Sequence, residues 1–210
     1  MSEPSINTPI NPTTNASAST PISRYPVPSL DSLPDDILAR ILAVQEKAKF
    51  IPNVFLALAY RPAEFRAFFA YYDAVMEREG STLSPAEKEM IIVATSAANG
   101  CQYCVIAHGA LLRVFSKEPL LADQIAVNYL HAPITPRQKE MLAFSLKLCR
   151  TPELVQDSDY ATLREHGYDD EDILDITGIT AFFGLSNRMA IVMSMQSNAE
   201  FYTMARAPRE

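Results

Sequence analysis

The sequence predicts an all-α fold: a compact helical domain with an internally duplicated helical unit, preceded by a disordered or loosely docked N-terminal arm. Three observations carry this prediction. Apolar residues recur with a helical period through most of the chain. Proline and glycine punctuate that pattern, and no alternation of β-branched residues extends beyond a few positions. Two helix starts carry the residues of a capping box.

The chain begins with a segment of low complexity. Ser, Thr, Pro and Asn make up 16 of the first 23 residues, so almost nothing there can be buried. Residues 24–28 follow with polyproline II character and could lie along the body of the protein. We therefore expect an arm over residues 1–28 and one helical domain over residues 29–210.

Helical segments fill that domain in order. Proline is the first residue of four of them, acidic residues open the last two, and glycine follows three of the helix ends. The predicted segments are 34–49, 53–60, 62–79, 85–98, 101–116, 120–129, 136–150, 157–166 and 170 to about 198, the last with a possible break near Gly184.

Two of these helix starts resemble each other. Ser84-Pro85-Ala86-Glu87 and Thr135-Pro136-Arg137-Gln138 both have the capping-box pattern, and their surroundings align at an offset of 51 residues. This similarity suggests the duplication, although only the first copy carries a C-x-x-C motif. The helix over 85–98 is apolar nearly all round, which predicts a central position.

Size and charge limit the possible partners. A chain of 210 residues with a formal net charge of −7 and no basic cluster is a poor match for nucleic acid or anionic membrane. Its longest apolar stretches, such as 90–98, fall short of the about 18 residues that a membrane span needs. The first residues show neither a secretion nor an import signal, so we expect a cytoplasmic protein.

The chemistry concentrates in Cys101-Gln102-Tyr103-Cys104. In a reducing compartment a C-x-x-C motif indicates redox or metal chemistry rather than a scaffold disulfide. Gly100 suits the left-handed position that ends a helix, which places Cys101 in the first turn of the next helix. Unpaired backbone N–H groups and the helix dipole stabilise a thiolate at that position.

Two further residues are expected beside the cysteines. On a helix, Cys101, Cys104 and His108 share one stripe, so the imidazole can accept a thiol proton or stabilise a thiolate. If the chain folds back at Gly100 into an antiparallel helical hairpin, Glu89 comes within about one turn of His108. The candidate catalytic residues are thus Cys104, Cys101, His108 and Glu89.

Less reactive interpretations exist for each of these residues. The cysteines could bind zinc, although only three His and one other Cys are available to complete a site, or they could be inert core residues. His108 could be a core histidine, and Glu89 could complement the dipole of its helix. We expect structural roles for His131, His166 and Cys149.

The arrangement Glu89, eleven intervening residues, and then Cys101-x-x-Cys104-x-x-x-His108 resembles the signature of the carboxymuconolactone decarboxylase-like superfamily, in its alkylhydroperoxidase D and peroxidase-related branch. The resemblance covers most of residues 29–198, with Phe50-Ile51-Pro52-Asn53-Val54-Phe55, Arg61-Pro62 and Asn187-Arg188 as further matches. It implies an all-α, homo-oligomeric protein without cofactor or metal.

The resemblance also implies roles for the four residues. Cys104 would be the peroxide-attacking thiolate, Cys101 the resolving thiol, and His108 with Glu89 the proton relay. Alkylhydroperoxidase D often has His between the cysteines, where this chain has Tyr103. A relay that uses that imidazole would be altered here, and with it the rate and the substrate preference.

Our leading hypothesis is a thiol-dependent peroxidase that reduces a hydroperoxide and is reset by an external dithiol. A second hypothesis is a non-catalytic redox-sensing or adaptor module whose disulfide changes an interface. A third is acid–base chemistry of the decarboxylase type, which would use His108 and Glu89 without the thiols.

Overall fold

The computed structural model describes residues 21–206 of the chain, and its regular elements in that range are all helical. The α-helices are α1 (Asp35–Ala48), α2 (Asn53–Leu58), α3 (Pro62–Met76), α4 (Pro85–Ala98), α5 (Gln102–Ser116), α6 (Leu121–Asn128), α7 (Pro136–Arg150), α8 (Asp157–Glu165), α9 (Asp170–Val192) and α10 (Ala199–Thr203). The predicted all-α class is confirmed.

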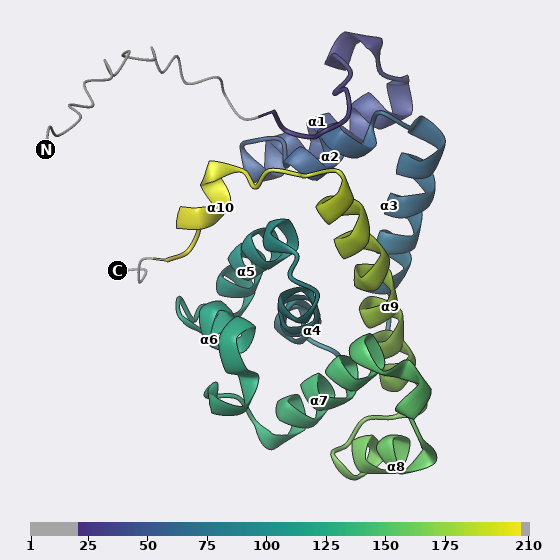
Figure 1. Cartoon of the computed structure of the whole chain (residues 1–210), viewed down its shortest axis with the longest axis vertical. Helices are drawn as coiled ribbons and strands as arrows, with labels where there is room; N and C mark the ends of the chain where they lie inside the picture. The colour runs from purple at the N-terminus through teal and green to yellow at the C-terminus, as the bar shows by residue number, and fades with distance from the viewer. Residues whose placement is uncertain (1–20, 207–210) are drawn as a thin grey trace, which may run out of the picture.

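Helix α4 occupies the centre of the molecule. In Figure 1 it is seen end-on, with α5, α6, α7 and α9 around it, and it packs on all four. Its side chains from Glu87 to Ser96 are buried on every face, which is the environment that its apolar sequence predicts. The carboxylate of Glu89 is among these buried side chains.

Both predicted capping boxes are present. Ser84 accepts a hydrogen bond from the Glu87 N–H at the start of α4, and Thr135 accepts one from the Gln138 N–H at the start of α7. Glu87 also accepts from Arg137 at 2.8 Å, so the two helix starts are linked directly. Whether the two helices derive from a duplication stays a prediction.

The last long helix differs from its prediction in two ways. Helix α9 passes through Gly184 without a break, because Phe182 and Phe183 beside the glycine are buried in the core and this packing outweighs the about 1 kcal/mol that glycine costs a helix. The helix ends at Val192, not near Asn198. Ser194 takes the left-handed conformation (φ 51°) and the Met195 N–H donates to the Ala190 carbonyl, which is a Schellman cap built without glycine.

One other helix end and one short helix also differ from the prediction. Helix α3 ends at Met76 rather than Glu79, and the chain then crosses to α9, where Arg78 forms a two-point ion pair with Asp175. The short helix α10 was not predicted, because it is held by tertiary contacts: the buried Arg113 donates to the carbonyls of Phe201 and Met204.

The end of the predicted arm is attached to the domain. Residues 1–20 lie outside the described residues, whereas the Arg24 N–H donates to the carbonyl of Met193 and the Gln196 N–H donates to the carbonyl of Ile22. Residues 22–24 therefore lie against the turn that follows α9.

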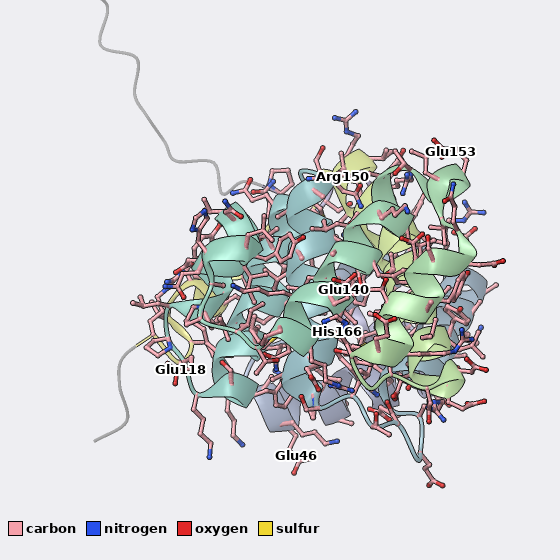
Figure 2. The ribbon with its side chains drawn as sticks, turned by 90° about the horizontal axis from the view of Figure 1, so that it is seen from below. Glu46, Glu118, Glu140, Arg150, Glu153 and His166 are labelled. Atoms are coloured by element: carbon pink, nitrogen blue, oxygen red, sulfur yellow. The ribbon has the colours of Figure 1, made fainter. Side chains whose placement is uncertain are left out.

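Helices α7 and α8 form the end of the molecule seen in Figure 2, where His166 is labelled. His166 is the C-cap of α8, and its Nδ1 lies 2.9 Å from the Thr162 carbonyl. Within residues 21–206, no helix combines the length and apolar character that crossing a bilayer requires.

Candidate active site

The C-x-x-C motif lies at the turn of a helical hairpin. Helix α4 ends at Ala98 with Asn99 as its C-cap, Gly100 takes the left-handed conformation (φ 67°), and the Cys101 N–H donates to the carbonyl of Ser96. Cys101 is then the N-cap of α5, which begins at Gln102, one position after the helix start that the sequence predicts. Its Sγ accepts from the Cys104 N–H at 3.5 Å, so the sulfur takes the place of a capping oxygen.

The two thiols of the pair differ in pKa. A hydrogen bond from the Cys104 thiol lowers the pKa of Cys101 to about 7, with help from the Cys104 N–H and the positive charge that His108 can carry, and against the cost of burial. The same hydrogen bond, together with burial, raises the pKa of Cys104. The pair therefore loses its first proton near neutral pH, and the negative charge rests mainly on Cys101.

This ionisation can be measured directly. We expect the ultraviolet absorbance of the thiolate to rise with a midpoint near pH 7 in the reduced protein, because the pKa of Cys101 lies there. The Cys101→Ser variant should lose that transition, whereas Cys149→Ser should keep it. A midpoint at the about 8.5 of an ordinary thiol would contradict the arrangement.

His108 and Glu89 meet as the hairpin symmetry predicts. The His108 Nδ1 lies 2.7 Å from Oε2 of Glu89, whose side chain is 2% exposed. Because a carboxylate only accepts, Nδ1 carries the proton, and Nε2 is the ring nitrogen left to exchange protons with a substrate. The ring of Phe183 packs nearly perpendicular to the imidazole, with the ring centres 4.7 Å apart, and this contact restricts the orientation of the imidazole.

Helix α9 supplies polar partners that motif reasoning did not find. Asn187 is fully buried, and its amide donates to the Ser96 hydroxyl at 2.9 Å and toward both sulfurs, where it favours the ionised forms. Its Oδ1 accepts from the Asn99 amide at 2.9 Å, which fixes the orientation of the group. The sequence offered Asn187 only as part of a family resemblance, because nothing local shows that α9 returns to this hairpin.

An apolar cavity of about 330 Å³ borders one cysteine of the pair. Cys104 and His108 lie on its wall, and most of the remaining lining is apolar and aromatic, including Phe68, Phe182 and Phe183. A separate recess of about 170 Å³ with a more polar lining reaches Cys101. A larger cavity, of about 440 Å³, lies between α2 and the end of α9 and borders none of the four candidate residues.

The third cysteine of the chain is separate from the pair. Cys149 in α7 lies 3.5 Å from the Asn99 Oδ1 and borders neither of the two cavities at the cysteine pair. Across residues 21–206, no three His, Cys, Asp or Glu side chains converge in a way that could hold a metal ion.

Comparison with known proteins gives a consistent result. Residues 62–132 match the carboxymuconolactone decarboxylase family. A crystal structure from Ralstonia eutropha JMP134, described as an alkylhydroperoxidase AhpD core and an uncharacterized peroxidase-related protein, is 62% identical, with a TM-score of 0.89, and the match covers 91% of this chain and all of that one. No curated protein sequence matches this chain.

Two other solved structures share the fold. A peroxidase-related protein from Silicibacter sp. TM1040 is 37% identical, with a TM-score of 0.85, and the match again covers 91% of this chain and all of that one. The debrominase Bmp8 is 18% identical, with a TM-score of 0.69, and the match covers 88% of this chain and 95% of that one. The second likeness concerns the fold alone.

Proposed function

The chain belongs to the carboxymuconolactone decarboxylase family, in its branch of alkylhydroperoxidase and peroxidase-related proteins, and from this membership we propose that it is a thiol-dependent hydroperoxide reductase. The observation that carries the proposal is the position of Cys104, which lies on the wall of an apolar cavity together with His108 and beside a second, easily ionised sulfur.

The first step is attack of the Cys104 sulfur on the outer oxygen of the peroxide. The Cys101 thiolate accepts the proton of the Cys104 thiol, and the thiolate formed at Cys104 breaks the O–O bond. One oxygen stays on Cys104 as a sulfenic acid, and the other leaves as the alkoxide of the organic group. His108, held by Glu89, supplies a proton to that oxygen, so an alcohol is released.

The second step closes a disulfide. The Cys101 sulfur attacks the sulfenic sulfur of Cys104 and displaces the hydroxyl as water, which leaves a Cys101–Cys104 disulfide across one turn of α5. In sum, two thiols and one hydroperoxide give one disulfide, one alcohol and one water. An external dithiol then returns the pair to its reduced form.

The cavity indicates the class of hydroperoxide. Its aromatic lining favours a substrate with an apolar organic group over hydrogen peroxide, because only the former gains by burial there. Two alternatives remain testable beside this one: a sensor that is oxidised once, and an acid–base enzyme that needs His108 and Glu89 but no thiol. The 18% identical debrominase shares the fold, so the fold alone does not choose the reaction.

Steady-state turnover distinguishes the three functions. With dithiothreitol in excess, we expect cumene hydroperoxide to be consumed for many turnovers, at least about tenfold faster in kcat/KM than hydrogen peroxide, as about 1.4 kcal/mol of apolar contact would give. Consumption that stops after one equivalent would indicate a sensor. Activity toward a lactone acid that survives alkylation of both cysteines would indicate acid–base chemistry.

The expected homo-oligomer, the cytoplasmic location and the extent of the arm and the domain stay predictions.

A further inference from the structure

The two cysteines of the pair border different cavities. Cys104 borders the apolar cavity, and Cys101 borders the recess between the start of α5 and the turn that follows α9. Tyr103 borders both spaces, is 6% exposed, and accepts a hydrogen bond from the Val54 N–H at 3.1 Å, so it is a fixed part of the wall between them.

We infer that the recess is the docking site of the reductant, a small dithiol, which attacks the disulfide at Cys101. This inference rests on the proposed function and adds a second substrate site to it. The peroxide and the reductant would then reach the same disulfide from two sides, each at its own sulfur.

The lining of the recess suits a polar thiolate better than the cavity does. Gln102, Ser194 and Gln196 border it, and both glutamines are exposed, so an entering thiolate keeps polar and aqueous contacts. Most side chains that border the apolar cavity are hydrophobic, and of its cationic residues Arg40 is already paired with Asp73 and Lys47 is exposed, so the same anion would lose more of its hydration there. The N-terminal end of α5 adds a favourable field for an anion at Cys101.

The exchange reaction balances at these positions. A thiolate of the reductant bonds to the Cys101 sulfur, the Cys101–Cys104 bond breaks, and Cys104 leaves as a thiolate that takes a proton from His108. The second thiol of the reductant, deprotonated by solvent, then attacks the reductant sulfur bound to Cys101. The reductant leaves as a cyclic disulfide and Cys101 leaves as a thiolate, for which its low pKa suits it.

The experiment separates the two half-reactions. Peroxide oxidation of the dithiol and dithiothreitol reduction of the disulfide are each followed in a single turnover, and diamide is used to form the disulfide for the second. Because diamide replaces the peroxide, the reductive rate can be measured even in a protein without peroxidase activity. Failure of the docking site is thereby distinguished from failure of the proposed function.

Each variant is designed to fill either the recess or the apolar cavity. Ile191 borders the recess and is 47% exposed, so Ile191→Trp can be accommodated in the fold while it fills the opening. We expect it to slow reduction at least fivefold and to change oxidation less than twofold. Leu111 borders the apolar cavity but not the recess. Leu111→Trp should therefore slow oxidation at least fivefold and change reduction less than twofold. Val192→Trp, on the next exposed position of α9, is the matched control and should change neither.

A second variant in the recess keeps the test valid if Ile191→Trp fails to fold. Gln102 is exposed at the first position of α5, and Gln102→Trp should also slow reduction alone. The inference is overturned if both recess variants fold, judged by circular dichroism, and reduce at the wild-type rate. It is equally overturned if Leu111→Trp slows reduction as much as oxidation, since the reductant would then use the apolar cavity.

Discussion

Replacing Cys104 by serine is expected to abolish hydroperoxide turnover, with a loss in kcat/KM of at least about a thousandfold, as when other enzymes lose their nucleophile. Cys104 is the sulfur on the wall of the apolar cavity, and a serine hydroxyl there would stay protonated and inert. The measurement is consumption of cumene hydroperoxide with excess dithiothreitol. Cys149→Ser, which changes a sulfur outside both cavities, should retain turnover within about twofold.

Replacing Cys101 by serine should give a different defect. Cys104 can still be oxidised, more slowly because the neighbouring thiolate that takes its proton is gone, but no disulfide can form. A sulfenic acid should therefore accumulate at Cys104 and be trapped there by dimedone. If Cys104→Ser turns over at the wild-type rate, or if dimedone labels no Cys104 in Cys101→Ser, the two roles are wrong.

The second large effect concerns the proton supply. We expect His108→Ala to slow oxidation by about a hundredfold or more, the usual range for the loss of a general acid. Glu89→Gln should slow it by about tenfold, because the amide keeps the size of the side chain but loses the charge that holds the Nδ1 proton. Single-turnover oxidation by cumene hydroperoxide gives both values.

Glu87 provides the matched control for Glu89. Both are buried acids of α4, but Glu87 bonds to Ser84 and Arg137 rather than to His108. Glu87→Gln should lower the free energy of unfolding in urea by about 1 kcal/mol through the weakened cap and ion pair, and leave the oxidation rate unchanged. Equal loss of rate in the two variants would mean that Glu89 acts only by stabilising the helix.

Much of the site is predictable from local spacing. The interval from Cys101 to His108 fixes a stripe on one helix, and the turn at Gly100 fixes which residue of the preceding helix faces His108. The contact between Glu89 and His108, separated by 19 positions, follows from that symmetry. Capping boxes are equally local, and both predicted ones are present.

What the sequence did not reveal depends on segments distant in the chain. Asn187 of α9 lies beside the sulfurs, and Phe68 of α3 and Phe182 of α9 line the cavity. The end of α9 was misplaced because its cap uses Ser194 in a conformation that usually signals glycine. The unequal ionisation of the two thiols follows from their hydrogen bond and from the place of Cys101 as the N-cap, where the prediction made it the first residue of the helix.

The most direct test is to treat the reduced protein with one equivalent of cumene hydroperoxide and to analyse its peptides by mass spectrometry without reduction. The account predicts a single Cys101–Cys104 disulfide, formed in step with one equivalent of alcohol, while Cys149 remains free. Cysteines 101 and 104 that stay unlinked while the peroxide is consumed would contradict it.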